Sequence, residues 1–505
     1  MRRREPPSLG GFFLFARRAS AWYGRVIPNL PERGRGGDMA NAFNQGQPVR
    51  SALDRARTKA YFRLLPILFA CYVIAYVDRN NVGLAKLNMM DDLPAFTETV
   101  IGVGSGFFFF TGYLLLEIPG TLLVEKWSAR KWISRIMITW GIVAALTATV
   151  REPWHFYGFR FTLGLAEAGF FPGVIVYLTH WFPSRDRARA LSWFLIATPI
   201  AQFISPFISY YMLRIGTVEK VGGVLVHHAA ILGLHGWQWL FIGWGLPAIV
   251  FGFVVFFFLT DRPSQARWLE PDERDALEEE LARDRAHRKA TGGHLTLAQA
   301  FANPKVLMLT AAYFFIVTGN YGVEIFLPSI LRDWYQPDYR LLTLILMVPP
   351  LGSLVGQLLV GWSSDRTKER RLHASLPILL GAGALSLTLI GKPPLPVMIA
   401  LFTVAALGLK AYLPAFWTLP SLFLTEAAAA GSIGLINSVG NLGGALGPSL
   451  LGFLKDKTHS YVPGLIYLCI SMAASAVIIL MLGLGRKPEH ASTAAPILDE
   501  IIEPV

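Results

Sequence analysis

The amino-acid sequence predicts an all-α membrane protein with twelve transmembrane helices, arranged as two six-helix, pseudo-symmetric bundles. Three observations predict this fold class: the composition, a succession of long apolar segments, and one long polar stretch that divides these segments six and six. Of the 505 residues, 53% are hydrophobic and 16% are charged, whereas a soluble domain usually carries about a quarter charged residues. The deficit of charge indicates a chain that lies largely in lipid.

The apolar segments are long enough to cross a bilayer, which takes about 20 mostly apolar residues. Three of them, at 190–213, 237–260 and 427–454, contain no charged residue. The predicted spans lie near residues 61–86, 98–122, 131–150, 154–181, 189–213, 237–260, 304–330, 340–363, 373–391, 395–421, 429–454 and 461–484.

The polar stretch between the sixth and seventh spans sets the predicted domain boundaries. Pro271 is placed there to open a charged helix, because proline is favoured in the first turn of a helix. Met39 is a candidate for the true translation start, and a genuine N-terminal extension is the alternative. The predicted units are a disordered segment at 1–50, a six-helix bundle at 51–260, a cytoplasmic linker at 261–303, a second bundle at 304–485 and a cytoplasmic tail at 486–505.

The positions of Lys and Arg predict the orientation of the chain. Basic clusters follow the even-numbered spans, for example Arg185, Arg187 and Arg189 after the fourth, and basic loops stay on the cytoplasmic side. Both termini are therefore expected in the cytoplasm, with the protein in a bacterial inner membrane. The same bias accounts for the net charge of +12 without a nucleic-acid partner.

Enzyme chemistry and cofactors are not expected. The two cysteines, Cys71 and Cys469, lie in apolar runs, which argues against a disulfide framework or a metal cluster. Three histidines follow the fifth span at a spacing that fits no tight metal site, so we expect no metal there. The loops contain no set of a nucleophile and its base.

Two acid–base pairs stand inside predicted spans of the first half. Asp78 and Arg79 lie in the first span, and Arg160 and Glu167 lie seven residues apart in the fourth. An ionisable residue within a span is costly and is presumed functional. Arginine binds both oxygens of a carboxylate, and a buried acid can exchange a proton. The pairs predict a carboxylate site with proton coupling, or internal ion pairs, Asp78 with Arg79 and Arg160 with Glu167, that only hold helices together.

The second half carries two lone charges in apolar helices, Glu324 in the seventh span and Lys410 in the tenth. They are expected either to pair with each other across a cavity or to contact the substrate, with Lys410 binding a second anionic group. Glu117, near the inner end of the second span, is expected to contact the following loop.

Two loops at equivalent places in the two halves form an internal repeat. TLLVEKWSARK spans 121–131, and GWSSDRTKERR spans 361–371. Such repeats are typical of transporters with a binding site between the halves, and an acid–base latch in each loop can hold neighbouring helices in one state. The predicted gating residues are Glu125, Lys126 and Arg130 in the first loop and Asp365, Arg366 and Arg370 in the second.

The chain resembles the major facilitator superfamily, and within it the anion:cation symporter family, in particular the bacterial branch of tartrate, phthalate and hydroxyphenylacetate permeases. The similarity extends from about residue 55 to about residue 484. Besides the eighth-span loop, the segments that carry it are DRNNVGLA, GFFFFTGYLLLEIPG, RFTLGLAEAGFFPGVIVYLTHWFP and PAFWTLPSLFLTEAAAAGSIGLINSVGNLGGALGP.

The resemblance implies roles for particular positions. Arg79 and Arg160 correspond to residues that contact the substrate carboxylate, and Asp78 and Glu167 to acids that couple protons. Further polar cavity positions are Tyr76, Gln202 and Asn437.

Some positions depart from the family pattern. Thr121 and Ser128 replace preferred glycines in the first loop, which predicts a weaker latch there. Gln238 and Trp244 replace an expected Arg and Glu. Glu324 and Lys410 are not standard for the branch, so we expect Glu324 to join the proton chemistry and Lys410 to help set the substrate.

The predicted function is import of a small organic anion (a sugar acid, hydroxy acid or aromatic carboxylate) by proton symport with alternating access. The expected partners are this anion, protons and the bilayer, and the protein is expected to be monomeric. One alternative is an uncoupled facilitator or exporter of organic anions. An alternative of another class is a transporter-like nutrient sensor, although the C-terminal tail is short for that role.

Overall fold

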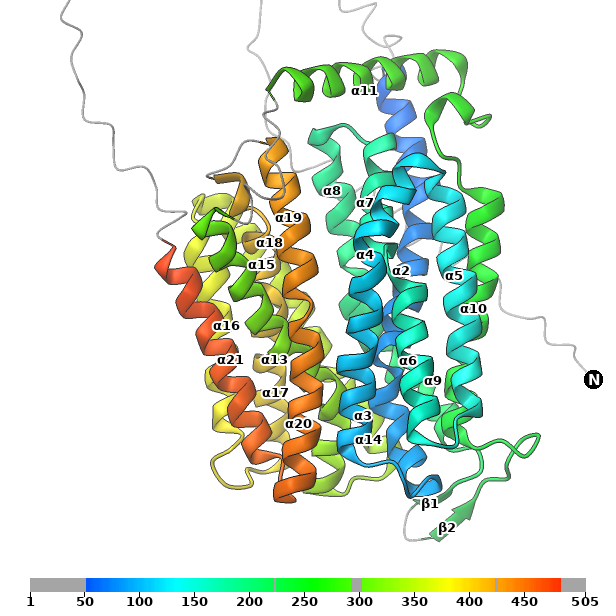
Figure 1. Ribbon diagram of the computed structural model, residues 1–505, viewed down its shortest axis with the longest axis vertical. Helices are drawn as coiled ribbons and strands as arrows, with labels where there is room; N and C mark the ends of the chain where they lie inside the picture. The colour runs from blue at the N-terminus through cyan, green and yellow to red at the C-terminus, as the bar shows by residue number, and fades with distance from the viewer. Residues whose placement is uncertain (1–50, 222–223, 292–301, 423–425, 483–505) are drawn as a thin grey trace, which may run out of the picture. The chain divides into compact units, whose positions relative to one another are not determined.

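The computed structural model describes residues 51–221, 224–291, 302–422 and 426–482, and its helices belong to one compact unit, Ala52–Val505. The predicted N-terminal segment with Met39, linker residues 292–301 and the tail at 486–505 lie outside the described residues. The described chain is almost entirely helical (Figure 1).

The N-terminal half builds its crossings from single helices or from consecutive helical segments. Its elements are α2 (Ala52–Asp92), α3 (Glu98–Val103), η1 (Gly104–Phe108), α4 (Phe109–Lys126), α5 (Ala129–Leu146), η2 (Thr147–Thr149), α6 (Pro153–Glu167), α7 (Phe170–Trp181), α8 (Ser184–Leu195), α9 (Ala197–Leu213) and α10 (Gly236–Phe258). A short antiparallel hairpin, β1 (Val218–Val221) with β2 (Val224–His227), pairs Val218 with His227 between α9 and α10.

The linker carries the expected charged helix, α11 (Pro271–Thr291), after the turn η3 (Pro263–Gln265). The C-terminal half then contains α13 (Pro304–Tyr335), α14 (Tyr339–Leu346), α15 (Val348–Thr367), α16 (Arg371–Leu387), α17 (Leu395–Ala411), α18 (Leu413–Phe416), η4 (Pro420–Leu422), α19 (Glu426–Gly440), α20 (Gly443–Thr458) and α21 (Val462–Met481).

The predicted spans correspond to these helices. Ten helices or helical runs among the described residues are long and apolar enough to cross a membrane. The two other predicted spans are shorter or divided: α16 has 17 residues, and the eleventh span consists of α19 followed by α20. The twelve-helix fold class predicted from the sequence is thus confirmed.

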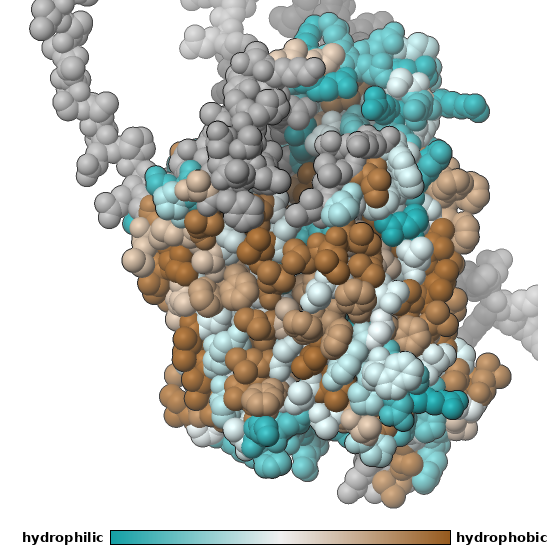
Figure 2. All heavy atoms as spheres, in the orientation of Figure 1, coloured by the Kyte–Doolittle hydropathy of each residue, from teal (hydrophilic) through white to brown (hydrophobic). Residues whose placement is uncertain are grey.

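The outer surface suits a lipid environment. Figure 2 shows apolar side chains over the middle of the visible face and hydrophilic ones toward the two ends. Exposed apolar side chains come from both halves, among them Phe257, Leu359 and Ile470. Apolar side chains on the outside of helices that satisfy their own backbone hydrogen bonds are what a bilayer requires. The chain is therefore a multi-pass membrane protein.

The two ends of the bundle differ. We call the end that carries β1 and β2 the hairpin end, and the opposite end, which carries α11, the α11 end (Figure 1). One hydrophobic core joins residues of the C-terminal half to hairpin-end residues of the N-terminal half, such as Ile101, Val150 and Leu213. A second core lies mainly in the N-terminal half and includes Leu277 and Leu281 of α11. The halves thus share a core at the hairpin end.

A helix break fixes the position of one predicted proton carrier. Glu167 is the last residue of α6, and Gly169 follows with a φ of 83° before α7 begins. This left-handed conformation is readily adopted only by glycine. A Cβ at Gly169 would also lie 3.2 Å from Nε1 of Trp132. The break therefore sets the Glu167 carboxylate at a helix end inside the bundle.

Candidate functional site

A cavity of about 360 Å³ lies between the two halves, within the usual range of about 300–1,000 Å³ for small-molecule sites. Its lining includes Tyr76 and Arg79 of α2 and Tyr321 of α13. Asp365 near the end of α15 also lines it, and this side chain is 73% exposed. The cavity therefore extends from the middle of the bundle to the surface at the α11 end.

The hairpin end is closed by polar contacts between the halves. Arg332 of α13 forms an ion pair with Asp91 at 3.0 Å and donates a hydrogen bond to the Leu87 carbonyl of α2. Two further contacts join α3 to the C-terminal half: the Thr99 backbone N–H donates to Asp456 at 2.7 Å, and the Tyr461 hydroxyl donates to Glu98 at 2.7 Å. The structure is therefore closed at the hairpin end and open at the α11 end.

The first ion pair in the cavity wall belongs to the N-terminal half. Arg79 of α2 forms an ion pair with Glu167 at the end of α6. Its second terminal nitrogen donates to the hydroxyl of Tyr321, 2.9 Å away on α13 of the other half. The rings of Phe109 and Tyr113 lie 5.6 Å from the guanidinium carbon. Arg79 is thus neutralised by an acid of its own half and contacted by a tyrosine of the opposite half.

The second ion pair belongs to the C-terminal half. Nζ of Lys410 on α17 lies 2.9 Å from Oε1 of Glu324 on α13. The hydroxyl of Tyr76, on α2 of the other half, accepts a hydrogen bond from Lys410 at 2.7 Å and donates to Glu324 at 3.1 Å. The pairing of Glu324 with Lys410, one of the two outcomes expected from the sequence, is present in this conformation. Tyr76, expected as a polar cavity residue, is the bridge between this pair and the N-terminal half.

Asp78 and Arg160 lie outside the lining of this cavity. Asp78 accepts a hydrogen bond from Nε1 of Trp140 at 2.6 Å, and both Asp78 and Arg160 are 2% exposed. The guanidinium carbon of Arg160 lies 5.2 Å from the ring centre of Phe156 and 5.4 Å from that of Phe241. The structure pairs Arg79 with Glu167 instead of with its neighbour Asp78. Contact of Arg160 with a substrate remains a prediction.

The two amide side chains predicted for the cavity, those of Asn437 and Gln202, line two different cavities. Asn437 of α19 lines the cavity and donates a hydrogen bond to Glu117 of α4 at 2.8 Å, so Glu117 has a partner in the other half. Gln202 lines a second, smaller cavity of about 100 Å³. Asn320 and Lys410 line both cavities, so they lie where the two cavities adjoin.

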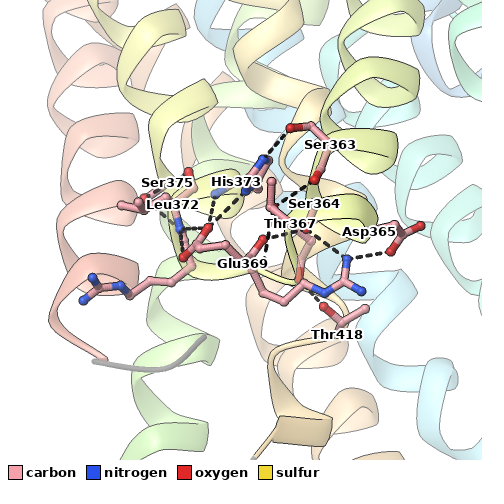
Figure 3. Close-up of polar contacts among 12 residues, drawn as sticks. Ser363, Ser364, Asp365, Thr367, Glu369, Leu372, His373, Ser375 and Thr418 are labelled. Atoms are coloured by element: carbon pink, nitrogen blue, oxygen red, sulfur yellow. Dashed lines mark hydrogen bonds and ion pairs between the residues drawn. The ribbon is translucent and has the colours of Figure 1, made fainter. Parts of the chain in front are cut away.

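The second of the repeated loops forms a compact polar cluster between α15 and α16 (Figure 3). Arg370 donates to Asp365 at 2.7 Å and to Ser364 at 2.9 Å. Glu369 accepts hydrogen bonds from the backbone N–H groups of Leu372 and His373 and so caps α16. Arg366, also predicted here, has its guanidinium 5.4 Å from the ring of Trp362. The acid–base contact predicted for this loop joins Asp365 to Arg370.

The first loop is held by an acid from outside the repeat. Asp261, after α10, accepts hydrogen bonds from the Arg130 backbone N–H at 2.9 Å and from the Ser128 hydroxyl at 2.6 Å. Ser128 also accepts a hydrogen bond from the Lys131 N–H and thereby caps α5. The side chains of Glu125 and Lys126 lie outside the part of the chain whose side chains the structure describes, so their predicted gating role stays a prediction.

Several polar residues of the cavity were not identified from the sequence, among them Tyr321, Asn320 and Gln357. Tyr321 contacts Arg79, and Asn320 and Gln357 line the cavity with buried amide atoms, Oδ1 and Nε2, that have no hydrogen-bond partner in the structure. A signal was present for Tyr321, because it precedes Glu324 by three residues and therefore shares a face of the helix with it. Gln357 carried no such signal.

The comparisons with known proteins agree with this fold. The family profile described as Major Facilitator Superfamily matches residues 68–448 and 309–498. An Agrobacterium vitis protein named "Putative tartrate transporter" is 39% identical over 88% of this chain and 98% of its own length. The "Quinolone resistance transporter" of Acinetobacter baumannii is 38% identical over 81% of this chain and 91% of its own length.

Solved structures show the same architecture at low sequence identity. The inward-open xylose transporter XylE from E. coli has a TM-score of 0.65 at 14% identity, covering 85% of this chain and 98% of that one. A bacterial homologue of the human lysosomal transporter Spinster, inward-facing and unoccupied, has a TM-score of 0.63 at 17% identity, covering 85% and 95%. The chain belongs to the major facilitator superfamily, as its sequence motifs predicted. It is a membrane transporter and not an enzyme.

Proposed function

We propose that this transporter imports a small organic anion together with protons across a bacterial inner membrane. The observation that carries the proposal is the ion pair between Arg79, which lines the cavity in the middle of the bundle, and the buried Glu167. An arginine in an apolar span serves well as a carboxylate receptor, because its planar group binds two oxygens at once. Relatives named for tartrate support an organic acid as the substrate.

The pair offers a direct route to coupling. A substrate carboxylate that binds Arg79 competes with Glu167 for the same guanidinium. A carboxylate displaced from its cation inside a protein binds a proton more readily, because burial disfavours its charged form. Anion binding and protonation of Glu167 therefore favour each other. Asp78, which Trp140 holds by a hydrogen bond, is the second predicted proton site, and Arg160 lies within electrostatic reach of it.

The orientation follows from the basic loops. With the α11 end in the cytoplasm, both termini are cytoplasmic and the open cavity faces inward. Alternating access then requires the hairpin end to open while the α11 end closes, with Asp365, Arg370 and the first loop holding the inner ends of the helices. A single chain supplies both halves of the cavity, so we propose that the monomer is the working unit.

The test uses purified protein in proteoliposomes with radiolabelled tartrate as the probe. We expect an inward proton gradient to drive accumulation in the wild type. Glu167→Gln should abolish gradient-driven accumulation but keep tartrate exchange, and Arg79→Gln should abolish both. Arg160→Ala should abolish uptake at normal expression, as the family resemblance implies. Unchanged gradient-driven accumulation in Glu167→Gln would refute the coupling role.

A second candidate function is export, which the relative named for quinolone resistance favours. The same vesicles distinguish the two. An exporter that exchanges protons for its substrate loses internal substrate when the outside is made acidic, whereas a symporter gains it.

A further inference from the structure

We infer that Lys410, with Glu324 and Tyr76, forms a second anion subsite, and that the transported substrate is a dicarboxylate held between Arg79 and Lys410. This inference rests on the proposed function as a carboxylate transporter. It assigns the second cation a role in selecting the substrate.

The two ion pairs have a crossed arrangement. Arg79 and Glu167 belong to the N-terminal half and are contacted by Tyr321 of the C-terminal half. Glu324 and Lys410 belong to the C-terminal half and are contacted by Tyr76 of the N-terminal half. Each pair thus supplies one cation, one acid that neutralises it in the absence of substrate, and one hydroxyl from across the interface. If Arg79 receives a carboxylate by displacing Glu167, Lys410 can receive one by displacing Glu324.

Both cations line the same cavity and have unused donors. Nε of Arg79 is buried and has no hydrogen-bond partner in the structure. A lysine ammonium has three N–H donors, and the described contacts of Lys410 use two of them, toward Glu324 and Tyr76. Gln357 lies on the cavity wall, and its Nε2 is a further buried donor that has no hydrogen-bond partner in the structure. Buried donors without partners are costly, and a ligand rich in acceptors would satisfy these donors in the cavity.

The spacing suits one short molecule. Tyr76, which contacts Lys410, and Arg79 are three residues apart on α2, and Tyr321 and Glu324 are three residues apart on α13. In each helix this separation is about one turn, or about 5 Å along the axis. A monocarboxylate could occupy the Arg79 site but would leave the Glu324–Lys410 pair in place. A four-carbon or aromatic dicarboxylate can reach both cations, and Oδ1 of Asn320, buried without a partner at the junction of the two cavities, can accept a hydrogen bond from a substrate hydroxyl.

The test compares pairs of acids that differ by one carboxylate. Affinities for the purified protein are measured by thermal shift for succinate against butanoate, tartrate against 2,3-dihydroxybutanoate, and phthalate against benzoate. We expect the preferred dicarboxylate to bind about tenfold or more tightly than its partner, as one added charge-assisted contact allows. Lys410→Gln should remove this preference while the affinity for the monocarboxylate stays within about threefold of wild type.

Matched variants separate recognition from folding. Lys410→Gln leaves Glu324 without its cation, so Glu324→Gln/Lys410→Gln, which removes both charges, is the control for stability and should show the same loss of preference. Glu324→Gln alone should keep the preference, because Lys410 remains. Equal binding of both members of every pair by the wild type, or a preference that survives in the double variant, would overturn the second subsite and leave the proposed function intact. If the wild type binds none of the acids, both proposals fail.

Discussion

The two ends of the bundle are held by contacts of different kinds. The hairpin end contains a buried contact: Lys86 is 0% exposed and lies 2.8 Å from Glu98, which Tyr461 reaches from the other half. At the α11 end, α11 is attached to α2 by pairs that include exposed ones, such as Arg55 with Asp272 at 2.5 Å, whose side chains are 38% and 56% exposed. Buried pairs become costly once one partner is lost, whereas exposed pairs contribute little. The hairpin end should therefore be strongly sensitive to loss of the buried Lys86–Glu98 pair, whereas α11 docking should respond only weakly to loss of one exposed pair.

The largest effect is expected from Lys86→Gln. This change leaves Glu98 buried without its cation, which costs about 3–5 kcal/mol. We expect a large fall in the melting temperature of the purified protein. Lys86→Gln/Glu98→Gln should recover much of the loss, because no buried charge then lacks a partner.

The matched control for Lys86→Gln is Lys455→Gln. Lys455 pairs with Asp333 at the same end, but the aspartate is 50% exposed, so the change should cost at most about 1 kcal/mol. Equal losses for Lys86→Gln and Lys455→Gln would contradict the importance of burial.

A smaller effect is expected from Gly452→Ala, where α20 crosses α3. A Cβ at this position would lie 2.2 Å from the Glu98 carbonyl oxygen, and overpacking of this kind costs about 1–3 kcal/mol. The strain is relieved when the hairpin end opens, so the equilibrium should shift toward the outward-open state. A cysteine introduced beside the closed contacts should then react faster with a reagent added from the hairpin side.

The control for Gly452→Ala is Gly383→Ala in α16, where a Cβ would meet no atom within 4 Å. It should leave the labelling rate unchanged. Equal labelling of the two alanine variants would argue against steric closure at α20.

The smallest effect is expected at α11. Burial acts to raise the pKa of Glu273, but hydrogen bonds from Lys59 and from the Glu270 backbone outweigh it and hold the pKa below the ordinary value of 4.5. A carboxyl group with a lowered pKa stabilises the docked helix above its ordinary pKa, and this contribution is lost as the pH falls through the lowered value.

Hydrogen exchange of the α11 backbone amides, measured at neutral and acidic pH, tests whether Glu273 stabilises the docked helix in this pH-dependent way. We expect protection to fall on acidification in the wild type, and to fall less in Lys59→Gln, which already lacks the main partner of Glu273. Arg283→Gln, in an exposed pair within α11, serves as the control and should keep the wild-type response. A response to acid that is the same in Lys59→Gln as in the wild type would rule out this pair as its source.

The sequence by itself determined the fold class and the position of each charge along the chain. Long apolar segments can satisfy their backbone hydrogen bonds in lipid only as helices, so length and composition predicted the spans, and the repeated loops predicted the two halves. A charge within a span is costly and therefore conspicuous. This signal identified Asp78, Arg79, Arg160, Glu167, Glu324 and Lys410.

Only the tertiary structure decided which charges meet. Neighbours in sequence suggested Asp78 with Arg79, but successive residues of a helix point in different directions, and the structure joins Arg79 to Glu167 across two helices. Tyr76 and Tyr321 each form a hydrogen bond with a residue of the other half that is more than 240 positions away in the sequence. No local periodicity in the sequence predicts such contacts. Likewise, the choice of which end is closed depends on contacts such as those of Arg332 and Tyr461, which form only once the two halves pack together.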